Sequence, residues 1–252
     1  MSDTRLVTIK KCPVCGRPSV HAYSITEDFD GREPNRIGLW YNCSCGVIFQ
    51  DEFPKDTIYD DDHVNRFITC KEFEDRSIHV HRTYINLIEE MTYGRKLLDV
   101  GYCYENPMNW LRERGWICWG IDKHHLVEED RYHIKGDFEN YDFRDLGFDV
   151  IWLGHVLEHF EDPIGALKKC YQITADDGIV VITTPDVDFI NQMTPSRFPH
   201  WKTKEHYILW NKESLKKEAE KLGFQVILCR SNFSERYMGL WDIHCILQKI
   251  YV

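Results

Sequence analysis

Residues 97–107 read LLDVGYCYENP, and this stretch decides the fold of the larger part of the chain. The apolar run before Gly101 predicts a buried strand, and the glycine predicts a sharp turn at its end. Residues 105–115, ENPMNWLRERG, predict a helix, with Gly115 as its C-terminal cap. Strand, turn and helix in this order begin an α/β domain.

The same alternation continues along the chain. Strands are predicted for WICWGID, YHIKGD, FDVIWLG and GIVVITTP, and helices for EDPIGALKKCYQIT and NKESLKKEAEKLG. Strands separated by helices predict a doubly wound, mostly parallel α/β sheet of seven strands. The last two strands, FQVILCRS and WDIHCILQKI, are joined without a helix, so we expect an antiparallel pair at one edge.

Polar residues and glycines follow the predicted strands in order. They are Asp99 and Gly101 after the first strand, Asp122 after the second, Asp137 after the third, and Gly154 with His155 after the fourth. Ligands of open α/β sheets bind outside the carboxyl ends of the strands. A carboxylate at Asp122 is placed to hold the hydroxyl groups of a ribose.

The N-terminal segment carries two cysteine pairs, in CPVCG at 12–16 and CSCG at 43–46. Such turns direct two thiolates at one ion, so Cys12, Cys15, Cys43 and Cys45 predict a structural zinc site in a small zinc ribbon. The second pair is one residue shorter than a standard knuckle. Four reduced cysteines without metal, or His21 or His63 in place of one cysteine, remain alternatives.

Domain boundaries follow from these patterns. We expect a zinc-ribbon module at 1–58, a helical connection at 59–94 and the main domain at 95–252. Apolar residues at helical spacing over 65–92 support the connection, and the acidic run 60–63 is interpreted as a solvated turn rather than a metal site. Five of the remaining cysteines are expected in the core, namely Cys70, Cys118, Cys170, Cys229 and Cys245, whereas Cys103 follows the first predicted strand of the main domain.

Composition limits the function classes. Of 252 residues, 43% are hydrophobic and the formal net charge is −10, which disfavours a broad nucleic-acid surface. The sequence shows neither a signal peptide nor an apolar stretch of membrane-spanning length, and ten cysteines without a secretion signal do not suggest disulfides. We therefore expect a cytoplasmic protein; its oligomeric state is left open.

Across residues 95–250 the chain resembles the class I S-adenosylmethionine-dependent methyltransferases, in particular those with an N-terminal zinc ribbon. LLDVG, WGID, KGDFEN, HVLEHFEDP and DDGIVVITTPD carry the resemblance. It implies a Rossmann-like methyltransferase fold and S-adenosylmethionine as cofactor. The implied cofactor-binding residues are Asp99, Gly101, Tyr102, Asp122, Asp137, Phe138, Leu153 and Gly154.

The cofactor loop departs from the family pattern. The family has glycines where this chain has Cys103 and Glu105. Cysteine is small enough to fit, whereas a glutamate would face the carboxylate of the cofactor's methionine unless it points to solvent in the first helical turn. The departure leaves two possibilities, retained cofactor binding and a scaffold that has lost it.

The sequence offers two sources of acid–base chemistry. HVLEH brings together His155, Glu158 and His159, either as a base with a bracing pair, as ligands of a divalent cation, or as structural residues. PHWKTKEHYILWN, residues 199–211, is expected to cover the acceptor, with His206 beside Glu205 as the preferred base. Its aromatic residues suit a sugar ring or simple packing, and Lys202 and Lys204 could meet a phosphate.

The leading functional hypothesis is methyl transfer to a small hydroxylated acceptor, a sugar, nucleotide-sugar or glycan precursor. The ribbon-bearing relatives that the chain resembles commonly act on such molecules. One alternative is a catalytically degenerate methyltransferase fold that serves binding or assembly. Another is an RNA or protein methyltransferase, which the acidic charge disfavours.

Overall fold

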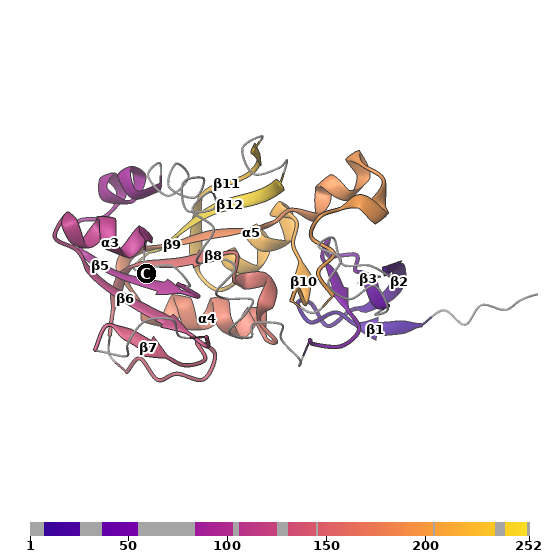
Figure 1. Ribbon diagram of the computed structural model, residues 1–252, viewed down its shortest axis with the longest axis horizontal. Helices are drawn as coiled ribbons and strands as arrows, with labels where there is room; N and C mark the ends of the chain where they lie inside the picture. The colour runs from indigo at the N-terminus through magenta and orange to yellow at the C-terminus, as the bar shows by residue number, and fades with distance from the viewer. Residues whose placement is uncertain are drawn as a thin grey trace, which may run out of the picture.

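The computed structural model describes residues 8–25, 37–54, 84–102, 106–124, 131–144, 146–203, 205–234 and 240–250. Two sheets organise this part of the chain (Figure 1). One has seven strands and carries the predicted α/β architecture. The other has five strands and contains the cysteine turns.

The large sheet has the strand order β11-β12-β9-β8-β5-β6-β7. Strands β5, β6, β7, β8 and β9 run parallel to one another, whereas β12 is antiparallel to both β9 and β11. This confirms the doubly wound sheet and the antiparallel edge pair. The strands are β5 (Lys96–Val100), β6 (Ile117–Asp122), β7 (His133–Lys135), β8 (Phe148–Gly154), β9 (Thr174–Pro185), β11 (Phe224–Ser234) and β12 (Leu240–Lys249).

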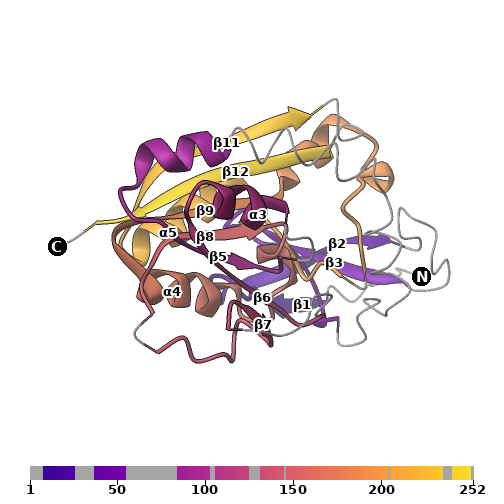
Figure 2. The same ribbon diagram turned by 60° about the vertical axis from the view of Figure 1, so that its left-hand side comes forward.

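Helices cover both faces of this sheet (Figure 2). On one face, a helix over residues 84–91 and α3 (Asn106–Glu113) pack against the sheet through Ile88, Met108 and Leu111. On the other face lie α4 (Pro163–Ile173) and α5 (Lys212–Lys221). The central strands are mostly apolar because both of their faces are buried.

Helix ends follow the sequence signals. Asp162 accepts a hydrogen bond from the backbone of Gly165 and starts α4, with proline at the first position. Asn211 and Ser214 form a capping box at the start of α5. Gly115 has φ +84°, as its role after α3 requires. These residues fix where each helix meets its strand.

The small sheet has the order β1-β2-β3-β4-β10 and is antiparallel throughout. Its strands are β1 (Ile9–Lys11), β2 (Pro18–Ile25), β3 (Gly38–Asn42), β4 (Ile48–Gln50) and β10 (Ile208–Leu209). The last strand comes from the segment after β9, which was expected to cover the acceptor. In Figure 1 it lies beside the N-terminal strands. The ribbon and the main domain therefore share a sheet.

Two further features differ from the sequence expectation. β9 begins at Thr174, directly after α4, rather than near Gly178. Between β9 and β10 the chain forms two 3-10 helices, η2 (Val187–Gln192) and η3 (Pro195–Arg197). Short turns of this kind have no hydrophobic period that a sequence could reveal.

Several expectations fall outside the described residues. They concern Cys103 and Glu105 in the cofactor loop, the acidic run with His63, Cys70, Lys204, and most of the helical connection. Only residues 84–94 of that connection are described, and of these 84–91 are helical. Within the described ranges no helix has the length and apolar character needed to cross a membrane.

Candidate functional site

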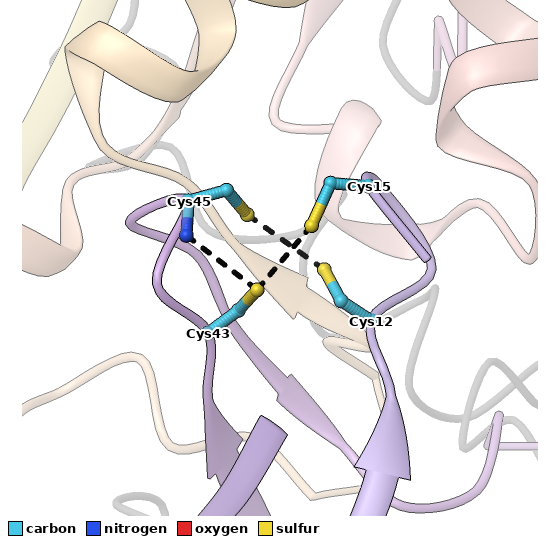
Figure 3. Close-up of side chains that lie close together, drawn as sticks. All are labelled: Cys12, Cys15, Cys43 and Cys45. Carbon is cyan, nitrogen blue, oxygen red and sulfur yellow. Dashed lines mark hydrogen bonds between the residues drawn. The ribbon is translucent and has the colours of Figure 1, made fainter. Parts of the chain in front are cut away.

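The four N-terminal cysteines converge on one point (Figure 3). The sulfur atoms of Cys12 and Cys45 are 3.8 Å apart, and those of Cys15 and Cys43 are 3.4 Å apart. Four thiolates bound tetrahedrally at about 2.3 Å from a zinc ion lie about 3.8 Å from one another. The hydrogen bond with Cys12 lowers the pKa of Cys45 to about 5. The donor set and its spacing fit a closed structural zinc site.

Glycines shape both cysteine turns. The amide of Gly16 donates to the carbonyl of Cys12, and that of Gly46 to the carbonyl of Cys43, both at 2.9 Å. Their φ values are +70° and +102°, which L-residues rarely adopt. In the shorter second pair, the turn that brings Cys43 and Cys45 together is closed by Gly46. His21 bonds the hydroxyl of Ser24 instead and is not in the cluster.

The cofactor candidates gather at the carboxyl edge of the large sheet. Gly101 follows β5 with φ +69°, and a Cβ there would lie 2.6 Å from Val156, in the loop after β8. Asp99 is buried, and burial, followed by the charge of Asp122, raises its pKa. The turn after β5 and the loop after β8 are thus in direct contact.

The other strand-end acids order their own turns. An oxygen of Asp122 accepts the amide of His124 at 2.8 Å. Asp137 accepts the amide of Glu139 at 3.0 Å and pairs with Lys123 at 3.2 Å. Phe138 is buried against Phe143 and Phe160, as Tyr102 and Leu153 are buried beside their strands. Gly154 remains half-buried at the end of β8.

The loop after β8 presents His155 in a left-handed conformation, with φ +53°. The side chain is 45% exposed and lies between two carboxylates, with Nδ1 3.4 Å from Glu158 and Nε2 3.6 Å from Asp242. Burial acts to lower the pKa of His155, but these carboxylates outweigh it and raise the pKa to about 9. Since η1 covers only Leu157–His159, the left-handed turn and not a helix brings His155 to Glu158.

Glu158 is fully buried at the centre of this loop. One carboxylate oxygen accepts the hydroxyl of Thr184, on β9, at 2.9 Å. Burial acts to raise its pKa, yet His155 and His159 hold it down at about 2. A buried carboxylate in this state needs cationic neighbours.

His206 joins the same cluster from the segment after β9. Its ring contacts that of His159 edge-on, with centroids 4.9 Å apart. One nitrogen of each ring and one oxygen of Glu158 lie within 4.8 Å of one another. Burial lowers the pKa of His206. The carboxylate of Glu205 forms an ion pair with Lys202 at 3.0 Å. The backbone carbonyl oxygen of Glu205 accepts a hydrogen bond from Nδ1 of His159 at 2.8 Å.

The ribbon holds this segment in place. The side-chain amide of Gln50, in β4, donates to the carbonyl oxygens of Thr203 and His206, and its backbone amide donates to that of Tyr207. Trp201 packs on Trp40 of β3 with ring centroids 4.8 Å apart, and Trp210 is fully buried. Because both tryptophans are buried, they pack the core rather than present a surface to a sugar ring.

The sequence did not point to two buried residues of this cluster, Asp242 and His200. Asp242, at the start of β12, faces His155, and its second oxygen is 3.9 Å from Nε2 of His200. Burial raises the pKa of Asp242 to about 6. The signal available was an acidic residue inside the apolar run of the last strand. His200 offered no signal, because its position depends on a non-periodic segment.

A family model described as a methyltransferase domain matches residues 76–228. No curated protein sequence matches the chain. Taken with the strand order and the strand-end acids, the family match confirms the resemblance inferred from the sequence.

Solved structures share the fold at low identity. A chain in the complex of the Haloferax volcanii Trm112 methyltransferase activator with a candidate methyltransferase has TM-score 0.58 and 17% identity, covering 76% of this chain and 96% of that one. A SAM-dependent methyltransferase from Archaeoglobus fulgidus has a TM-score of 0.52 and 21% sequence identity, and the match covers 69% of this chain and 94% of that one. The 1,6-didemethyltoxoflavin-N1-methyltransferase of Burkholderia thailandensis, with bound S-adenosylhomocysteine, has a TM-score of 0.51 and 14% sequence identity. That match covers 84% of this chain and 99% of the other.

Proposed function

Because this chain belongs to the methyltransferase domain family, we propose that it transfers a methyl group from S-adenosylmethionine to a hydroxyl of a small acceptor. The observation that carries the proposal is the position of the His155 loop. It follows β8 and touches the turn at Gly101, where cofactors of such sheets bind. Acid–base groups and cofactor residues therefore meet at one edge.

The cofactor supplies an electrophilic methyl group on its sulfonium, and the chain supplies its position. Asp122 holds the ribose hydroxyls, and Asp137 with Phe138 holds the adenine. The backbone of Leu153 and Gly154 lines the sulfonium pocket. The turn formed by Asp99, Gly101 and Tyr102 receives the methionine end. One of the similar solved structures contains S-adenosylhomocysteine, which supports the choice of cofactor.

A hydroxyl acceptor must lose its proton as the methyl group arrives. Histidine is suited to this step near neutral pH. His155 and His206 are the two proposed bases, one from each side of Glu158. His155, with its pKa raised to about 9, is protonated near neutral pH and would act as a base only at higher pH. His159 and Glu205 act as positioning residues, since the carbonyl of Glu205 accepts the Nδ1 proton of His159.

A sugar, nucleotide-sugar or glycan precursor is the proposed class of acceptor. The support is the polar character of this cluster, in which the exposed His155 lies beside the carboxylates of Glu158 and Asp242. Multiple hydroxyls on the acceptor would match them. The structural zinc ion at the four cysteines has no part in the chemistry, because four protein ligands leave no open position.

The test is calorimetric titration of the purified protein with S-adenosylhomocysteine, followed by acceptor screening with S-adenosylmethionine. We expect one binding site per chain and turnover with a hydroxylated small molecule. No binding at about millimolar cofactor would favour the scaffold alternative. Turnover only with RNA or protein would reject the small-acceptor assignment while retaining the methyltransferase activity.

A further inference from the structure

Glu158, His159 and His206 form a cluster with the composition of a metal site, apart from the four cysteines. We propose that they bind a divalent transition-metal cation. Their candidate ligand atoms lie within 4.8 Å of one another. Ligand atoms around one such ion lie about 3.0–3.5 Å apart, given bonds of about 2.0–2.2 Å. Each side chain would move by about 1 Å or less to close on the ion.

Both histidines are oriented as metal ligands usually are. Nδ1 of His206 donates to the carbonyl of His200 at 3.0 Å, and Nδ1 of His159 donates to that of Glu205 at 2.8 Å. A proton on Nδ1 leaves the lone pair on Nε2, and backbone carbonyls commonly fix metal-binding histidines in this tautomer. Nε2 of His159 is 4.0 Å from Oε1 of Glu158.

Glu158 provides the anionic ligand. Its Oε2 atom is fixed by the hydroxyl of Thr184, while Oε1 is buried and accepts no hydrogen bond from any residue that the structure describes. A buried carboxylate oxygen without a donor is costly unless a cation satisfies it. His155 is 3.4 Å away, but its half-exposed side chain is shared with Asp242. A cation between Glu158 and the two histidines would satisfy this oxygen directly.

The ligand set indicates which cation fits. Two imidazoles and one carboxylate leave coordination positions open and suit manganese, iron, cobalt or zinc better than magnesium or calcium. The cysteine cluster, by contrast, selects zinc through four soft thiolates. Because Mn²⁺ binds thiolates weakly, it is a selective probe of the proposed site in zinc-loaded protein.

The site also assigns roles to the two histidines. If the proposed function holds, an open position on the cation would bind the acceptor oxygen and make its proton easier to remove. His206 would then be a ligand and His155 the remaining base. This consequence rests on the proposed function, whereas cation binding does not.

Electron paramagnetic resonance of free Mn²⁺, titrated with zinc-loaded protein, tests the proposal without cofactor or acceptor. We expect one bound Mn²⁺ per chain. Glu158→Gln, which keeps an oxygen for Thr184, and His206→Ala should each weaken binding by about 10- to 100-fold. His155→Ala is the matched control, and it should bind Mn²⁺ as well as the wild type because His155 is not one of the three proposed ligands.

Three outcomes would overturn the site. The first is no Mn²⁺ binding at about millimolar concentration. The second is equal loss in His155→Ala and His206→Ala, which would place the ion on the other side of Glu158. The third is binding that Glu158→Gln leaves unchanged in protein whose folding is verified by thermal unfolding. Absence of cofactor binding would defeat the proposed function alone and leave this site intact.

Discussion

A Cβ atom on Gly46 would lie 2.5 Å from Nδ2 of Asn211, so the second cysteine turn packs directly against the residue that begins α5. The ribbon is therefore in intimate contact with the main domain at a helix N-terminus. This contact gives a matched pair of variants, because Gly16 has the same role in the first turn without the same neighbour.

Gly46→Ala should destabilise the protein more than Gly16→Ala. Both positions have positive φ, so alanine carries about 1–2 kcal/mol of backbone strain at either. Among the described residues, no atom lies within 4 Å of a Cβ at Gly16, whereas a Cβ at Gly46 displaces Asn211, at a further cost of about 1–3 kcal/mol. Denaturant unfolding of the two variants and the wild type measures the free energy of unfolding that each substitution removes. Equal losses would mean that the Asn211 side chain moves aside freely.

We expect about one zinc ion per chain, bound by the cysteine cluster. Cys12→Ser should reduce the metal content to near zero, since the ligand removed is one of four. Cys229→Ser, at a half-buried cysteine outside the cluster, is the control and should keep its zinc. Elemental analysis of the purified proteins measures the difference. If the Cys12→Ser protein kept its zinc, the assignment of the zinc site to these four cysteines would be wrong.

Asp122→Ala should weaken S-adenosylhomocysteine binding by about 1.5–3 kcal/mol, or roughly 10- to 150-fold. On the proposed assignment, the interaction lost would be a charge-assisted hydrogen bond to the ribose. Asp176→Ala is a suitable control, because Asp176 is exposed near the start of β9, far from the carboxyl edge of the sheet. Unchanged affinity in Asp122→Ala would place the ribose elsewhere.

Once an acceptor is found, replacing the base should abolish most of the turnover. His155→Ala or His206→Ala should lower kcat by roughly 10²–10⁴-fold, with cofactor affinity within about threefold. Near-wild-type kcat in both variants would mean that methyl transfer proceeds by positioning alone. Mn²⁺ binding separates the roles, because only the ligand variant should lose it.

Acid should destabilise the protein through His244, on β12. Burial, followed by the charges of His155 and Arg230, lowers the pKa of His244 to about 4, and Tyr84 contacts its ring. Because the unfolded chain binds this proton near pH 6.5, stability declines as pH falls from about 6.5 towards 4. Between pH 7 and pH 5 the loss from this group is about 2 kcal/mol. His244→Gln should lack this component in urea unfolding, and an unchanged pH dependence would refute it.

The large sheet could be predicted because its signals are local. The run from Leu97 to Gly101 specifies a buried strand and its turn without help from the rest of the chain. β10 could not be predicted, since a two-residue strand has no period and its pairing with β4 is determined by packing across the fold.

The sequence pointed to some residues of the candidate site but not to the contacts that bring them together, and it did not point to Asp242 or His200. His155, Glu158 and His159 are close in sequence, and the motif made their grouping visible. The placement of His206 against Glu158, and of Asp242 against His155, depends on β12 and on the bonds from Gln50. Such contacts between distant segments leave no spacing in the sequence.

The pairing of β4 with β10 has a consequence for the order in which the chain folds. The four cysteines span 33 positions and can gather early during synthesis, whereas Gln50 contacts a partner 156 positions later. Until that partner leaves the ribosome, the β4 edge has unpaired amides beside the apolar Phe49. Nascent chains stopped before residue 206 should therefore expose an aggregation-prone edge that a chaperone or a matching strand could cover.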